Sequence, residues 1–139
     1  MKSRIRWGRV IMAALISEVA VMALMMTILG AWVLFARNGS PGGVQQIGQA
    51  VGFYVAPPAS GLATFLSARW ATRQLSANFV LNGTMVGVVT VILTLGFLFG
   101  ARPEDRLMYL VSFVIRLAGG YLGGWSMQSR TASTLEQVR

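Results

Sequence analysis

Long apolar blocks, almost free of charged residues, constrain this chain more than any other feature of its sequence. A helix needs about 20 apolar residues to cross a bilayer, and backbone groups inside lipid must find their hydrogen bonds within the protein. Only 12% of the 139 residues are charged, whereas a soluble domain carries about a quarter. Too few polar residues remain to cover a water-facing surface, so the blocks predict an all-α integral membrane protein.

Four such blocks predict a bundle of four transmembrane helices that forms a single membrane domain over residues 1–139. We expect the spans at about residues 10–36, 47–68, 77–100 and 107–127. The tryptophans support these limits, because indole rings prefer the boundary between lipid and water. All four lie near the expected ends of spans: Trp7, Trp32, Trp70 and Trp125.

Basic residues at the ends of the blocks predict how the bundle is oriented. Eight of them fall on the side that holds both termini: Lys2, Arg4, Arg6, Arg9, Arg69, Arg73, Arg130 and Arg139. Three fall on the other side: Arg37, Arg102 and Arg106. The richer side should be cytoplasmic, so both termini are expected inside. Because the net charge of +8 comes from these flanking residues, we expect contacts with lipid headgroups and no binding of nucleic acid.

The residue types that the chain lacks exclude most catalytic chemistry. There is no cysteine and no histidine, so thiolate chemistry and imidazole ligands for metal or haem are absent. The only lysine is Lys2 and the only aspartate is Asp105, which leaves no Schiff-base lysine within a span and no aspartyl dyad. We therefore predict that the protein is not an enzyme and that it holds no cofactor or metal.

Two charged residues interrupt the apolar blocks, Glu18 in the first and Arg116 in the last. Charges inside a membrane are costly and usually pair or mark a functional site. At helical rise both lie at comparable depths, so they are able to meet. One interpretation is a buried ion pair that fixes which helices touch, and the other is a Glu18 site for a proton or a cationic substrate. Asn82 is expected either to extend a polar network with Glu18 or to bridge two spans.

Small residues recur every three or four positions along three of the blocks. In lipid, close approach through such residues takes the place of the hydrophobic effect in holding helices together. The pattern predicts helix packing, with a contact surface for a partner, lipid or quinone as the alternative. The expected packing residues are Gly52, Ser60, Gly83, Gly87, Gly119, Gly120, Gly123 and Gly124.

Two adjacent prolines, Pro57 and Pro58, lie near the middle of the second block. They remove two backbone donors and clash with the preceding turn, so they predict a kink or a break in that helix. A kink that shapes the bundle is one interpretation. The other is a broken helix that lines a substrate site, as in some transporters.

The first block resembles a known transporter family over a short stretch. The sequence Leu15–Ile16–Ser17–Glu18–Val19 is similar to the first helix of small multidrug-resistance transporters, in which a membrane glutamate binds protons and cationic drugs. As a whole, the chain is similar to bacterial four-span membrane proteins of uncharacterised function, including the stretch Pro57–Ser60. This second resemblance implies a multi-pass protein of the bacterial inner membrane and supplies no activity.

These features lead to two hypotheses about function. The first is a structural or accessory membrane protein that packs through its small-residue stripes against itself, as a homo-oligomer, or against other membrane subunits. The second is a small oligomeric transporter, coupled to protons, that uses Glu18. Glu18→Gln separates them, because a structural ion pair would lose stability whereas a carrier would stay folded and lose proton coupling.

Overall fold

The computed structural model of the chain describes residues 5–35, 41–75 and 77–137, and these are all-α, with no strand among them. A short 3-10 turn, η1 (Pro103–Asp105), precedes the last helix. The α-helices are α1 (Trp7–Phe35), α2 (Pro41–Tyr54), α3 (Ala56–Thr72), α4 (Phe79–Gly100) and α5 (Arg106–Gln137).

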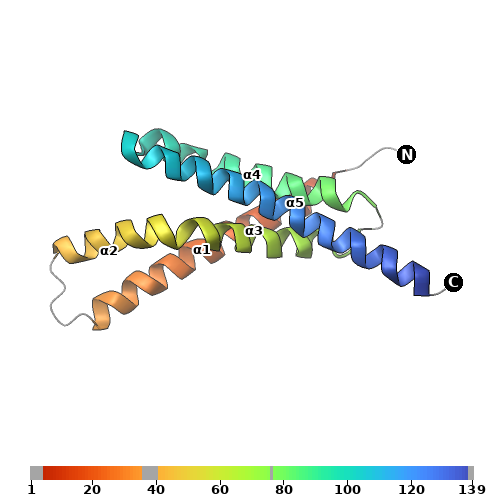
Figure 1. Cartoon of the computed structure of the whole chain (residues 1–139), viewed down its shortest axis with the longest axis horizontal. Coiled ribbons are helices and arrows are strands. Elements are labelled where there is room, and N and C mark those ends of the chain that lie inside the picture. The colour runs from red at the N-terminus through yellow and green to blue at the C-terminus, as the bar shows by residue number, and fades with distance from the viewer. Residues whose placement is uncertain (1–4, 36–40, 76, 138–139) are drawn as a thin grey trace.

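The helices run back and forth along one long axis (Figure 1). The start of α1, the connection from α3 to α4 and the last turns of α5 lie at one end, which we call the proximal end. The start of α2, the end of α4 and η1 lie at the opposite end, which we call the distal end. The helix α5 packs mainly against α3 and α4, and α1 packs against the same two helices from another side.

In the described part of the chain, three helices are long and apolar enough to cross a membrane, rather than the four that the sequence predicts. They are Trp7–Phe35, Phe79–Gly100 and the segment Arg106–Arg130 of α5. The predicted span at about residues 47–68 is divided between α2, with 14 residues, and α3, with 17. Each piece is shorter than the roughly 20 residues that one crossing requires.

The division falls at Val55, two residues before the first of the two prolines. The backbone N–H of Val55 still donates to the Val51 carbonyl at 2.9 Å, and Ala59 donates to the Val55 carbonyl at 3.0 Å. Between them Pro57 and Pro58 have no N–H to donate, so the helical ladder is interrupted there. The two helices nevertheless follow one another along the axis of the molecule (Figure 1).

The glycines of α4 and α5 bring the two backbones into direct contact. A Cβ added at Gly83 would lie 2.6 Å from the Gly120 carbonyl oxygen and 2.7 Å from the Gly124 Cα. A Cβ at Gly87 would lie 2.9 Å from the carbonyl oxygen of Arg116. Real Cβ atoms essentially never approach so closely, so these positions exclude any side chain.

The other two glycines of α5 face α3 instead of α4. A Cβ at Gly119 would lie 2.5 Å from the Gly61 carbonyl oxygen, and one at Gly123 would lie 2.6 Å from that of Phe65. The overlapping glycine pairs therefore serve two neighbouring helices within the chain. Gly52 differs from the other predicted packing residues, because no atom lies within 4 Å of a Cβ built there.

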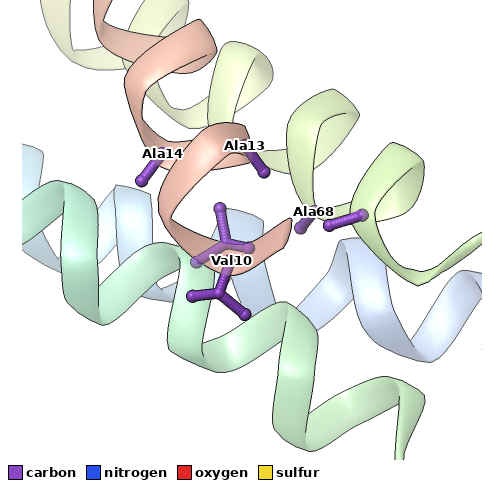
Figure 2. Close-up of a cluster of buried hydrophobic side chains, with 6 residues drawn as sticks. Val10, Ala13, Ala14 and Ala68 are labelled. Carbon is purple, nitrogen blue, oxygen red and sulfur yellow. The ribbon is translucent and has the colours of Figure 1, made fainter. Parts of the chain in front are cut away.

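Near the proximal end, α1 meets α3 and α4 in a core of small apolar side chains (Figure 2). Ala13 points toward α3, which carries Ala68, and Val10 points toward α4. The short side chains allow the three helices to approach closely, as expected for helices in lipid. The core consists of Val10, Ala13, Ala14, Ala68, Ala71 and Val86.

Several residues that support the predicted orientation lie outside the described ranges. These are Lys2, Arg4, Arg37 and Arg139. The described basic residues keep the same bias, with Arg6, Arg9, Arg69, Arg73 and Arg130 on proximal segments and Arg102 and Arg106 on distal ones.

Asn78 precedes α4 with φ 60° and ψ 36°, in the left-handed region. Asparagine tolerates this conformation better than other residues that carry a Cβ. We expect Asn78→Ala to lower the free energy of unfolding by about 1–2 kcal/mol, whereas Asn78→Gly should lower it much less. Thermal unfolding in detergent, followed by circular dichroism, measures both. Equal stability of the two variants would contradict a conformational role for Asn78.

Candidate functional site

A cavity of about 980 Å³ occupies the distal half of the molecule. It lies where α1 and α2 diverge from α4 and α5 toward the distal end (Figure 1). Its volume is at the upper end of the range typical of small-molecule sites, about 300–1,000 Å³. Its lining extends from Gln45 on α2 and Arg102 before η1 to Glu18 and Arg116 in the middle of the bundle.

Glu18 and Arg116 form an ion pair at the inner end of this cavity, which we call the Glu18–Arg116 pair. The Nη1 of Arg116 donates to the Oε1 of Glu18 and also contacts the Thr94 hydroxyl at 3.4 Å. The side chain of Glu18 is 15% exposed and that of Arg116 is 8% exposed. The pair thus joins α1 to α5 where each charge alone would be costly to bury.

The backbone packing of α5 sets the position of Arg116. Its carbonyl lies against Gly87 of α4, and Gly119 and Gly120, one turn further along, contact α3 and α4. With α5 held this closely on two sides, the Arg116 side chain extends toward α1 and meets Glu18. The glycine stripes and the charged residues are therefore parts of one arrangement.

One donor of Arg116 is left without a partner. Its Nε is buried and has no hydrogen-bond acceptor among the described residues. A buried donor without an acceptor costs about 1–3 kcal/mol, and more when it belongs to a charged group. The guanidinium is consequently incompletely satisfied by the protein itself.

The cavity lining combines polar and apolar side chains. Three glutamines of α2 contribute amide groups, and Ser112 of α5 contributes a hydroxyl that lies 3.2 Å from the Ser60 hydroxyl. The Ser60 hydroxyl also donates to the Pro57 carbonyl at 2.8 Å. The amides are those of Gln45, Gln46 and Gln49, and the apolar lining includes Met22, Phe53, Phe97, Met108 and Phe113.

The proximal half of the molecule is closed by successive layers of contacts. Next to the Glu18–Arg116 pair, the hydroxyls of Ser17 and Thr64 lie 3.3 Å apart and are buried. Beyond them lies the small apolar core of α1, α3 and α4. At the proximal end, the Arg9 side chain donates to Gln74, which ties α1 to the segment after α3.

No family model, curated protein or solved structure matches this chain. Among the described residues, no group of three or more acidic, histidine or cysteine side chains is placed to hold a metal ion.

The structure brings some of the predicted site residues together and separates others. Glu18 and Arg116 form an ion pair at the inner end of the cavity. Gly52 and Pro57 line the same cavity. Asn82 does not extend a network to Glu18. Its Oδ1 accepts from the Arg6 backbone N–H at 2.9 Å and its Nδ2 donates to the Asn78 carbonyl at 3.0 Å, both at the proximal end.

The polar lining that α2 contributes is not among the site residues predicted from the sequence. Gln45 and Gln49 are four residues apart and therefore share one face of a helix, together with Gly52. A glutamine-bearing helical face at the start of a predicted span is the signal that would have found them. It becomes a cavity wall only because α2 diverges from α5.

Proposed function

We propose that the protein is a small membrane carrier that binds its substrate in the distal cavity and couples transport to a proton through Glu18. The observation that carries this proposal is the position of the Glu18–Arg116 pair at the closed end of a large, partly polar cavity. An ion pair that only held helices together would need no such access. Ionisable residues inside membranes commonly mark substrate paths and proton relays.

The asymmetry of the molecule supports this proposal. The cavity leads from the distal end to the pair, and small side chains and hydroxyl contacts close the path from the pair to the proximal end. A carrier needs two such states, in which access alternates between the two sides of one binding site. The described arrangement corresponds to the state that is open at the distal end.

We propose four crossings of the membrane, with α2 and α3 together forming the second. Together they run from the distal to the proximal end (Figure 1), and broken helices are tolerated where they line a cavity. The excess of basic residues places the proximal end in the cytoplasm. The cavity then opens to the periplasmic side of a bacterial inner membrane, and we propose that the carrier works there as a homo-oligomer.

The accessibility of the cavity provides a direct test, because the chain has no cysteine of its own. We expect Gln49→Cys and Ser112→Cys, both in the cavity lining, to react with a membrane-impermeant maleimide added to right-side-out vesicles. Ala13→Cys, at a fully buried core position, is the matched control and should stay unlabelled. Protection of both cavity positions in right-side-out and inside-out vesicles would contradict a substrate path.

Transport itself can be measured in proteoliposomes that contain a pH-sensitive dye. A panel of small organic anions, cations and zwitterions is added outside, and at least one compound should change the internal pH. Glu18→Gln should abolish this proton movement, because an amide cannot exchange a proton in this range. A compound that moves protons equally well in the Glu18→Gln variant would overturn the assigned role of Glu18.

A second candidate, an accessory subunit of a larger membrane complex, is favoured by one feature. The last part of α5 continues beyond the other helices at the proximal end (Figure 1), where a partner subunit could contact it. The small-residue stripes give this candidate less support, because those of α4 and α5 are in contact within the chain. Native mass spectrometry after mild extraction tests it, since an accessory subunit would co-purify with unrelated subunits at fixed stoichiometry.

A further inference from the structure

We infer that the substrate is a small organic anion, with one carboxylate and an apolar body, that binds to Arg116 and enters together with one proton. This inference rests on the proposed carrier function and names its substrate class. Three observations carry it: the partnerless Nε of Arg116, the charge balance of the cavity and the combination of polar and apolar side chains in its lining.

The first observation concerns the geometry of the guanidinium. Glu18 and Thr94 both contact Nη1, whereas Nε has no acceptor among the described residues. The Nε–H and an Nη2 hydrogen lie along one edge of a guanidinium, and this edge matches the two oxygens of a carboxylate. Because Nε is enclosed in the structure, an incoming carboxylate reaches it by turning the guanidinium away from Glu18.

The second observation concerns charge. The charged side chains that line the cavity are Glu18, Arg102, Asp105 and Arg116, with two acids balancing two bases. An anion that binds Arg116 in place of Glu18 leaves Glu18 as a buried carboxylate without its cation. A buried charge without a partner is neutralised most readily by a proton. Glu18 therefore becomes a carboxylic acid when the anion binds, and the occupied site stays neutral.

The third observation concerns the body of the substrate. Aromatic and methionine side chains contribute to the cavity lining beside the glutamine amides, among them Phe53, Phe97 and Phe113. A site with a few polar groups that fix orientation and an apolar remainder suits an amphipathic small molecule. An inorganic anion would use only the Arg116 end of this space.

The test is a binding series on the purified full-length protein in detergent, measured by isothermal titration calorimetry. The probes are acetate, butyrate and phenylacetate, with phenylacetamide and 2-phenylethylamine as neutral and cationic counterparts of phenylacetate. We expect phenylacetate to bind most tightly. Its Kd should rise about tenfold per pH unit between about pH 6 and about pH 8, because one proton binds with each anion.

Variants test the proton coupling through Glu18 and the anion binding to Arg116 separately. Glu18→Gln should bind phenylacetate with a Kd that no longer depends on pH. The double variant Glu18→Gln/Arg116→Gln, which removes both charges and leaves no buried charge unpaired, should lose binding at least a hundredfold. Arg69→Gln, a basic residue that is not in the cavity lining, is the matched control and should behave like the original protein.

The other possible outcomes distinguish a failure of the anion class from a failure of the carrier function. Tighter binding of 2-phenylethylamine than of phenylacetate would overturn the anion class and leave the carrier function standing. Binding of none of the carboxylates, or binding that survives in the double variant, would overturn the inference as well. Binding of phenylacetate with the expected pH dependence, but without any proton movement in proteoliposomes, would instead overturn the carrier function.

Discussion

Arg116→Ala should destabilise the protein more than any other single truncation in the cavity. It removes the cation that faces Glu18. In this pair the Arg116 side chain is 8% exposed and the Glu18 side chain is 15% exposed. Removing one member of a buried pair leaves an uncompensated charge, and we expect a loss of about 3–5 kcal/mol in the free energy of unfolding. Unfolding in mixed micelles, followed by tryptophan fluorescence, measures this loss.

Two controls show whether this loss of stability comes from the unpaired charge of Glu18. The double variant Glu18→Gln/Arg116→Gln should be much closer to the original protein in stability, because neither charge then stays buried alone. The loss in Arg116→Ala should also shrink as the pH falls, since a protonated Glu18 carries no charge. If Arg116→Ala were as stable as the original protein at neutral pH, the pair would contribute nothing to the fold.

Glu18→Gln is expected to behave differently from Arg116→Ala. Glutamine keeps an acceptor oxygen for the Nη1 of Arg116, and the remaining guanidinium lines a cavity that also holds polar side chains. The variant should therefore fold and should lose proton coupling, which is the outcome that favours a carrier over a structural pair.

Gly83→Ala is expected to have the second largest effect, although it adds only one methyl group. The new Cβ would lie 2.6 Å from the Gly120 carbonyl oxygen and 2.7 Å from the Gly124 nitrogen and Cα. All three are backbone atoms of α5, so no side chain can rotate to make room and the two helices must separate. Overpacking of this kind costs about 1–3 kcal/mol, which thermal unfolding in detergent will show.

The same substitution elsewhere on α4 provides the control. Gly96→Ala places its Cβ where no atom lies within 4 Å, so it should leave stability unchanged or raise it by about 0.5–1 kcal/mol through the higher helix propensity of alanine. Equal effects of Gly83→Ala and Gly96→Ala would show that the α4–α5 contact does not depend on the glycines. A separation of α4 from α5 should also displace Arg116, whose carbonyl contacts Gly87.

The all-α class and the long apolar helices follow from the amino-acid sequence. Its composition leaves few polar residues for a water-facing surface, and lipid requires backbone groups that are satisfied within the protein. Among the described residues, three helices long and apolar enough to cross a membrane could be located from their apolar blocks. The sequence also singled out Glu18 and Arg116, since charged residues inside such blocks are rare. These conclusions needed only local information about each segment.

The tertiary structure alone decided which of these residues meet and what surrounds them. Asn82 and Glu18 both lie in apolar blocks, yet they do not meet. Asn82 lies in the first turn of α4, where it bonds to Arg6 just before α1, whereas Glu18 lies about three turns into α1 and lines the cavity. Gly52 and Gly83 look alike in sequence, but only Gly83 contacts a neighbouring helix. Helix register and divergence depend on all the contacts of a helix together, and no periodicity within a single helix specifies them.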